Sequence, residues 1–282
     1  MNIKILVCCH KEDIYLSIPP YMPIHVGKEK SSIELGIPGD NTGDNISTKN
    51  NSYCELTGMY WAWKNLKGLD AIGLCHYRRY FDFHKQCPSY LPYGNFKVEY
   101  FEKIDFNLTD KISKYIEKGY VIVPSKIILG TTLEVQYCLI HDSKDLRTLE
   151  NVIKDHCNDR YADAFYHVIH GNNKLHPFNM FIMPWDVFDR YCQWLFPILK
   201  AVELKTDTHS YDPYQQRLFG FMAERLFNVF LYAERIRTKD FPVICINESS
   251  LERGRLKTYA INIIKNMNVF IYKLLYYYNT SL

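Results

Sequence analysis

Short apolar runs alternate along the chain with longer stretches in which apolar residues recur every three or four positions. The short runs predict buried strands at residues 3–9, 69–75, 119–126 and 178–183. The longer stretches predict helices at residues 52–68, 131–157, 185–199 and 212–235. Because strands and helices alternate, we expect an α/β fold with a mainly parallel central sheet.

The length of 282 residues predicts one large domain over 1–250, followed by a C-terminal segment over 251–282. That segment is basic and rich in tyrosine, with Lys257, Lys265 and Lys273 between apolar residues and no acidic residue after Glu252. We expect it to form an amphipathic helix that either lies on an anionic membrane surface or packs against its own domain.

Targeting signals are not evident in the sequence. No window reaches the roughly 18 to 20 uncharged apolar residues of a membrane span, and the first apolar stretch is too short for a secretion signal. The nine cysteines show no disulfide framework and no zinc-site spacing, which is typical of reduced cysteines. The sequence therefore predicts a cytoplasmic protein, either free or peripheral on the inner face of the plasma membrane.

Composition narrows the class of ligand. A hydrophobic fraction of 47% is typical of a globular protein and excludes a disordered or fibrous one. The net charge of +3 excludes nucleic-acid binding through overall charge, so we expect no nucleic-acid partner. The aromatic fraction of 15% is high, and such side chains suit sugars, nucleobases and membrane interfaces alike.

Basic and aromatic side chains follow the ends of two predicted strands. They are His10 and Lys11 after the first strand, and His76, Tyr77, Arg78 and Arg79 after the second. In open α/β sheets ligands bind at the carboxyl ends of strands, and arginine forks match phosphate oxygens. The cluster predicts a diphosphate site, with a surface ion-pair patch as the alternative.

Two further pairs of polar residues lie in predicted helices. His141 and Asp145 are four residues apart, so they share a helix face and form either part of a site or a plain helix contact. Glu224 and Arg225 interrupt an apolar run, which is costly unless they are paired or functional.

Familiar nucleotide and catalytic motifs are missing. No GxGxxG follows the first strand, and no P-loop, GxSxG elbow or HExxH motif occurs. A metal-dependent nucleotide-sugar transferase typically carries a DxD motif after a buried strand, where this chain has His-Tyr-Arg-Arg. We expect cationic side chains to neutralise a leaving diphosphate instead, with no metal ion and no cofactor.

Six strings of the sequence are distinctive: GDNTGDNIS at 39–47, YCELTGMYWAWKN at 53–65, GLCHYRRYF at 73–81, NMFIM at 179–183, YCQWLFPIL at 191–199 and GFMAERLFNV at 220–229. They resemble a family of short bacterial glycosyltransferases of capsular polysaccharide, exopolysaccharide and O-antigen assembly. The resemblance covers residues 3–235 and implies a GT-A-like nucleotide-sugar-binding fold. Some relatives are similar to galactofuranosyltransferases that use UDP-galactofuranose.

Position and resemblance together suggest roles for the donor residues. His10, Lys11, Asp40, Asp44 and Asn45 would border the nucleotide. The segment His76–Arg79 would hold the diphosphate and stabilise it as it leaves.

Inverting transfer needs a base that takes the proton of the acceptor hydroxyl, and Glu224 is the leading candidate, with Asp44 and Asp145 behind it. Arg225 would orient Glu224 or reach a phosphate, and Asn179 would bind a sugar hydroxyl. His141 and Asp145 complete the expected acceptor or sugar-binding set. The four tryptophans lie at helix spacing and form either a platform for a sugar or part of the hydrophobic core. They are Trp61, Trp63, Trp185 and Trp194.

The sequence thus predicts an inverting, metal-independent glycosyltransferase that moves a sugar from a UDP-sugar onto a lipid-linked saccharide acceptor. Two alternatives stay open. A non-catalytic sugar- or lipid-binding subunit of a polysaccharide assembly complex would explain the aromatic residues and the basic tail. A nucleotidyl- or phosphotransferase would share the diphosphate site.

Overall fold

The computed structural model describes residues 1–247, together with residues 261, 264, 265 and 267. The strands of the large sheet are β1 Ile3–Cys9, β2 Tyr21–His25, β3 Ala71–His76, β4 Arg79–Phe81, β5 Tyr93–Lys97, β6 Val121–Pro124, β9 Phe181–Pro184, β10 Thr238–Phe241 and β11 Val243–Asn247. A separate two-stranded ribbon is formed by β7 Ile127–Ile128 and β8 Lys174–Leu175.

The α-helices are α1 Asn50–Tyr53, α2 Leu56–Asn65, α3 Asp110–Glu117, α4 Leu133–Ile140, α5 Ser143–His156, α6 Asp159–Phe165, α7 Trp185–Glu203 and α8 Leu218–Ala233. A π-helical turn follows α6 at Tyr166–His170. Short 3₁₀ turns occur at Lys28–Lys30, Ser47–Lys49, Val98–Lys103 and Gln215–Arg217.

The body of the sheet has the strand order β2-β1-β3-β9-β6-β10. Parallel pairing joins β2 to β1, β1 to β3 and β6 to β10, whereas β9 pairs antiparallel with both β3 and β6. Five of these six strands therefore point the same way and β9 alone is reversed, which confirms the expected mainly parallel α/β sheet. A smaller extension, β4-β11-β5, continues from the end of β3.

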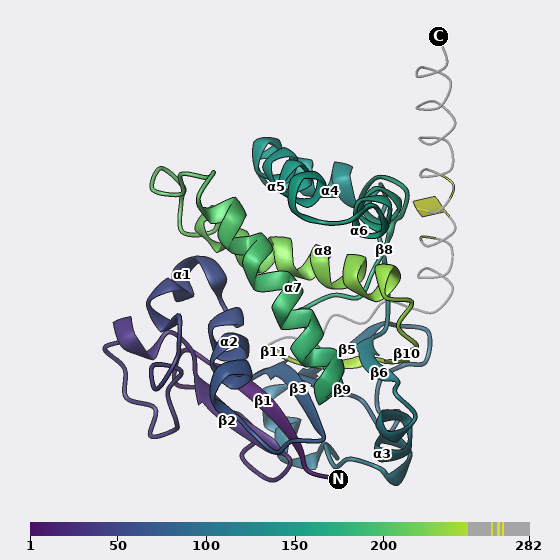
Figure 1. The fold of residues 1–282 in the computed structure, drawn as a ribbon. Helices are drawn as coiled ribbons and strands as arrows, with labels where there is room; N and C mark the ends of the chain where they lie inside the picture. Colours follow the sequence, from purple (N-terminus) through teal and green to yellow (C-terminus); the bar gives the residue numbers. More distant parts are fainter. Residues whose placement is uncertain (248–260, 262–263, 266, 268–282) are drawn as a thin grey trace.

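Alternating strand residues face two separate cores. On β1, Leu6 and Cys8 belong to the core beneath the helices, whereas Ile5 and Val7 belong to the core on the opposite face. Helices α2, α7 and α8 cover the first face, and the group α4–α6 stacks on α8, farther from the sheet (Figure 1). Helix α3 lies against the other face, where Ile112 is fully buried.

Two predicted helices are each divided in the structure. The stretch predicted at 52–68 breaks into α1 and α2 at Cys54, whose backbone is not helical and has a positive φ of 51°. The stretch predicted at 131–157 breaks into α4 and α5, where Asp142 caps α5 by accepting from the backbone N–H of Lys144. His141 is consequently the C-cap of α4 and Asp145 belongs to α5, so the prediction that they share one helix face was wrong.

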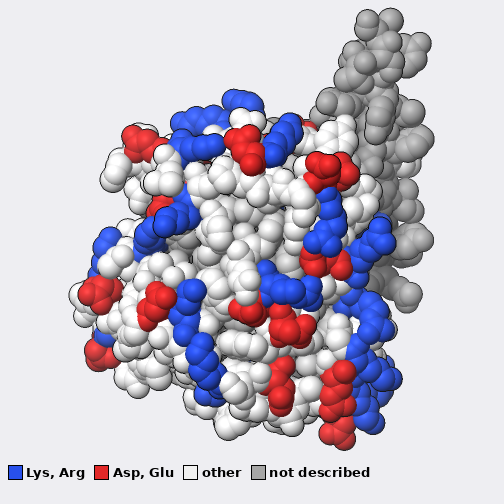
Figure 2. Space-filling model, viewed as in Figure 1, with Lys and Arg blue, Asp and Glu red and all other residues white. Residues whose placement is uncertain are grey.

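Most of the predicted C-terminal helix over 251–282 lies outside the described residues. The four described residues of that segment are helical, and Lys265 Nζ donates to the carbonyl oxygen of Ile128 at 2.8 Å. Within the described part of the chain, no helix is long and apolar enough to cross a membrane. Basic and acidic side chains are intermixed over the face drawn in Figure 2.

Candidate functional site

A large cleft of about 1710 Å³ opens at the edge of the sheet where the parallel strands end. His10 and His76 stand at the ends of β1 and β3, and Ser125 follows β6. Because β9 is reversed, its beginning reaches the same edge and brings Phe178 and Asn179 into the cleft lining. Helices α4 and α8 supply the facing wall. The structure thus places the cleft where ligands bind in open α/β sheets.

One end of the cleft is cationic. Arg78 donates from Nε to Oδ1 of Asp13 at 2.8 Å, and this ion pair orients the guanidinium. The guanidinium of Arg79, an exposed side chain, lies 4.6 Å from the ring centroid of Phe178. His10 makes an edge contact with the ring of Tyr77 at 5.4 Å. All of these except Asp13 line the cleft, so the predicted diphosphate cluster His76–Arg79 is brought together with His10.

Both backbone polar groups of Phe178, its N–H and its carbonyl, have side-chain hydrogen-bond partners. Glu224 accepts from the Phe178 N–H at 2.6 Å, and Nε2 of His76 lies 2.7 Å from the Phe178 carbonyl oxygen. Since a carbonyl can only accept, Nε2 of His76 carries the proton, and burial lowers the pKa of this histidine. Phe178 and Asn179 have φ of 75° and 52°, a conformation that costs about 1–3 kcal/mol for each such residue. These two bonds hold that turn in place.

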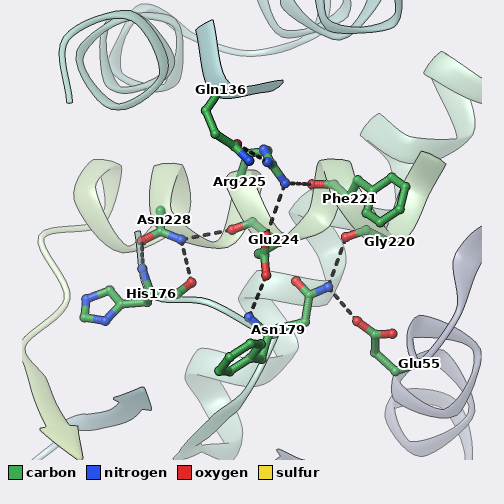
Figure 3. Close-up of polar contacts among 10 residues, drawn as sticks. Glu55, Gln136, His176, Asn179, Gly220, Phe221, Glu224, Arg225 and Asn228 are labelled. Atoms are coloured by element: carbon green, nitrogen blue, oxygen red, sulfur yellow. Dashed lines mark hydrogen bonds and ion pairs between the residues drawn. The ribbon is translucent and has the colours of Figure 1, made fainter. Parts of the chain in front are cut away.

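Asn179 joins three distant parts of the chain (Figure 3). Its side-chain amide donates to Oε1 of Glu55 at 2.6 Å and to the carbonyl oxygen of Gly220 at 3.0 Å. The side chain is buried, and its own oxygen has no hydrogen-bond partner among the described residues. Asn179 therefore links Glu55, which directly precedes α2, to Gly220 of α8. The side-chain oxygen of Asn179 remains as a hydrogen-bond acceptor between these two elements.

Glu224 and Arg225 are paired with each other across 3.2 Å. Arg225 is buried and also donates to Gln136 Oε1 at 2.6 Å and to the Phe221 carbonyl oxygen at 3.1 Å (Figure 3). The sequence left open whether these charges are functional or paired. The structure shows that Arg225 ties α8 to α4 and that Glu224 supports the Phe178 turn.

An aromatic wall closes the cleft on the side of α4 and α8. The ring of His141 stacks on Phe221 with centroids 4.1 Å apart, and Tyr214 contacts both. Burial lowers the pKa of His141 to about 4, although its hydrogen bond with Gln215 acts in the opposite direction. His141 therefore lines the cleft as a neutral ring.

Five predicted site residues do not line the cleft: Lys11, Asp40, Asp44, Asn45 and Asp145. Asp40 is buried and accepts from the backbone N–H groups of Gly27 and Lys28 and from the Ser47 hydroxyl. It thereby closes the Gly- and Asn-rich loop upon itself.

The other four residues also contact groups that do not line the cleft. Asp44 is exposed and accepts from Tyr60, Asn45 accepts from the backbone of Ser47, and Lys11 pairs with Asp13. Asp145 accepts from the Tyr211 hydroxyl.

Four charged residues that line the cleft were not among the predicted site residues: Glu55, Lys126, Arg217 and Lys265. Glu55 lies inside the motif string 53–65, three residues after Ser52, a spacing that is also typical of a helix-capping box. Arg217 donates from Nε to the Cys54 sulfur at 3.4 Å, and its guanidinium lies 5.4 Å from the ring of Phe221.

The four tryptophans pack against the core and none of them lines the cleft. Trp63 donates to Asp189 at 2.7 Å, for example, and Trp194 stacks on Tyr161. Among the described residues, no three His, Cys, Asp or Glu side chains are grouped as metal ligands would be.

Comparison with known proteins gives two matches. The profile of a family described as a domain of unknown function, DUF4422, matches residues 4–235. The apo structure of WbbM, a bifunctional glycosyltransferase, is similar with a TM-score of 0.79 and 30% sequence identity over 90% of this chain. That match covers 47% of the WbbM chain, so this chain spans about half of its length. No curated protein matches the sequence significantly.

Proposed function

The chain belongs to the DUF4422 family, and on that premise we propose that it is a glycosyltransferase of bacterial polysaccharide synthesis. Its similarity to WbbM supports this reaction class. The observation that carries the proposal is the cleft itself, in which cationic side chains at strand ends stand with two carboxylates, Glu55 and Glu224. A diphosphate leaving group and a hydroxyl that loses a proton require these two kinds of group.

The donor is a UDP-sugar, and UDP-galactofuranose is the first candidate because of the family resemblance. Arg78 and Arg79 bind the diphosphate at the end of β3, with His10 and His76 beside them. Asp40, Asp44 and Asn45 lie outside the cleft lining, so they contribute through the shape of the loop that follows β2. Lys11 also lies outside the lining and contributes through its ion pair with Asp13, which is the partner of Arg78.

Transfer proceeds with inversion and without a metal ion. A carboxylate takes the proton of the acceptor hydroxyl, the hydroxyl oxygen bonds to the anomeric carbon, and the bond to UDP breaks. The electron pair leaves with the diphosphate, where the arginines stabilise it. We assign the base to Glu55, which accepts from the neutral amide of Asn179, and give Glu224 a positioning role because both of its oxygens hold other groups.

The acceptor is a lipid-linked saccharide at the inner face of the plasma membrane. It enters along the wall formed by α4 and α8, which carries His141, while Asp145 and Arg225 hold that wall together. The basic segment 251–282, mostly outside the described residues, would meet the anionic lipid surface.

The test is a thermal-shift screen with UDP-, GDP-, CMP- and dTDP-sugars, each with and without excess EDTA. A ligand at about 100 times its Kd stabilises the folded protein by about 2.7 kcal/mol. We expect UDP-sugars alone to raise Tm, equally in EDTA, and one of them to be consumed when a lipid-linked saccharide is added.

Indifference to every nucleotide sugar would contradict the proposal. Consumption that stops in EDTA and returns with manganese would contradict the metal-independent step. Binding of a UDP-sugar without turnover on any acceptor would favour the non-catalytic subunit.

A further inference from the structure

We propose that Tyr214, with His141 and Phe221 packed against it, is a stacking platform that binds the sugar ring of the acceptor. The inference rests on the proposed function and deepens it, because it names the chemical class bound at one wall of the same cleft. Pyranose rings present a face of C–H groups that packs on aromatic rings, as apolar surfaces do.

The three rings form one continuous group. Tyr214 lies nearly parallel to His141, with an interplanar angle of 15° and centroids 5.8 Å apart, and its centroid is 5.1 Å from that of Phe221. Tyr214 is 50% exposed, whereas His141 is only 7% exposed. The outer ring is thus open to the cleft and the inner ring supports it.

The segment that carries Tyr214 is anchored at several points. Oδ1 of Asp212 accepts from the backbone N–H groups of Tyr214 at 2.8 Å and Gln215 at 3.0 Å. Gln215 in turn bonds to the His141 ring and to the carbonyl oxygen of Ile140. The ring is therefore ordered before a ligand arrives, which reduces the entropy lost on binding.

Asp145 holds the same segment from α5. Its two carboxylate oxygens accept from the Tyr211 hydroxyl at 2.8 and 3.0 Å. Asp145 was expected to contact the sugar directly, but it does not line the cleft. Its contacts make it a positioning residue for the platform.

The position of the platform favours the acceptor over the nucleotide. Phosphate-binding groups stand at the ends of β1 and β3, whereas the platform comes from α4, α8 and the segment between α7 and α8. Arg217 lies between the two regions, since its guanidinium is 5.4 Å from Phe221 and its charge acts on His10 and His76. A ring on the platform therefore rests on different elements from those that carry the proposed diphosphate-binding groups.

The experiment compares Tyr214→Ala, Tyr214→Phe and Tyr232→Ala in the full chain. Tyr232 is a matched control, because it is 51% exposed and stacks on His167 with centroids 4.4 Å apart, but it lies outside this cleft. The probes are methyl β-D-galactopyranoside, methyl β-D-glucopyranoside and methyl α-L-rhamnopyranoside. Their Kd values are measured by saturation-transfer NMR in the presence of UDP, and UDP binding is measured separately by calorimetry.

We expect at least one glycoside to bind the unmodified chain and Tyr214→Ala to raise its Kd by about tenfold. Tyr214→Phe and Tyr232→Ala should change it by less than about twofold, and UDP affinity should stay the same in all variants. The platform is refuted if no glycoside binds, if Tyr232→Ala weakens binding equally, or if Tyr214→Ala weakens UDP instead. Failure of the unmodified chain to bind UDP would count against the donor assignment, and it is read independently of the glycoside result.

Discussion

The two carboxylates beside the Phe178–Asn179 turn have unequal surroundings. Glu224 accepts from a backbone N–H and also pairs with the buried guanidinium of Arg225, so taking a proton would break an ion pair. Glu55 accepts from the neutral amide of Asn179 and can take a proton without that loss. This difference is the reason for proposing Glu55 as the base and Glu224 as a positioning residue.

Replacement of each carboxylate by its amide separates these roles. Glu55→Gln keeps an oxygen for Asn179, so we expect an unchanged Tm and UDP affinity with kcat lower by about 10²–10⁴. Glu224→Gln leaves Arg225 without its charged partner, so we expect a loss of unfolding free energy on the order of 3 kcal/mol. The measurements are urea unfolding, UDP calorimetry and single-turnover transfer. Normal turnover in Glu55→Gln, beside a folded but inactive Glu224→Gln, would reverse the assignment.

Three arginines of the cleft lining could be singled out from the sequence because an arginine is unusual at their positions. Arg78 and Arg79 follow a buried strand, and Arg225 interrupts an apolar helix, so both positions attract notice. Glu55 and Tyr214, by contrast, are residue types that occur often beside helices and in loops, so the sequence does not single them out. Their roles depend on the approach of segments far apart in the sequence, as in the bond between Asn179 and Glu55, and no local pattern encodes that approach.

Helix α2 reaches the sheet closely because of a glycine in its first turns. A Cβ added to Gly58 would lie 2.8 Å from a methyl carbon of Val26 and 3.6 Å from the sulfur of Cys8. Val26 follows β2, and Cys8 is in β1. Since Glu55 directly precedes α2, this close contact also sets the distance of that carboxylate from the strand ends.

Gly58→Ala tests this packing. Alanine favours a helix over glycine by about 1 kcal/mol, but forcing a methyl group into a filled contact costs about 1–3 kcal/mol. We expect net destabilisation in urea unfolding. Because the nearest atom belongs to Val26, the Val26→Ala and Gly58→Ala changes should be less than additive, with a coupling of about 1 kcal/mol. If the Gly58→Ala variant were more stable than the unmodified chain, α2 would not need its close contact with Val26.

Helix boundaries were harder to predict than helix positions. The apolar spacing continues through 52–68 and through 131–157, although the structure breaks both stretches. At Cys54 the break is a single residue with a positive φ, and a cysteine in the sequence does not indicate such a conformation. Asp142 is a residue type that favours helix starts, which could have indicated the break, but the prediction followed the continuous apolar spacing instead.

Across the whole molecule, burial keeps several histidines neutral. It lowers the pKa of His10, His76, His141 and His176. Burial also acts to lower the pKa of His170, but the combined effect of Glu134 and Glu150 exceeds that of burial, so this pKa is raised instead. The unfolded chain therefore binds more protons than the folded chain in mildly acidic solution.

Stability should accordingly fall with acidification. For His141 the pKa is 6.5 when unperturbed and about 4 in the folded chain, so its contribution is present above 6.5 and is lost as pH falls toward 4. We expect the unfolding free energy to drop by about 1–2 kcal/mol between about pH 7 and pH 5 on account of this group. His141→Phe keeps a stacked ring and should flatten the profile of urea unfolding against pH. If the unfolding free energy of the variant fell with pH as steeply as that of the unmodified chain, His141 would not be the cause of the pH dependence.

The direction of most strands could be predicted, but that of β9 could not. Parallel strands joined by helices have a preferred arrangement, which the alternation of elements predicts. The apolar run at 178–183 indicates a buried strand but carries no mark of its orientation. Only its neighbours, β3 and β6, decide that it runs the other way.

The central place of β9 has a consequence during synthesis on the ribosome. Strands β3 and β6 lie on either side of β9, yet both are complete long before Phe181–Pro184 is made. Until then each has an unpaired edge along strands as apolar as AIGLCH and VIVP. Such edges pair readily with other chains. On the nascent chain these two edges therefore stay unpaired until β9 emerges between them.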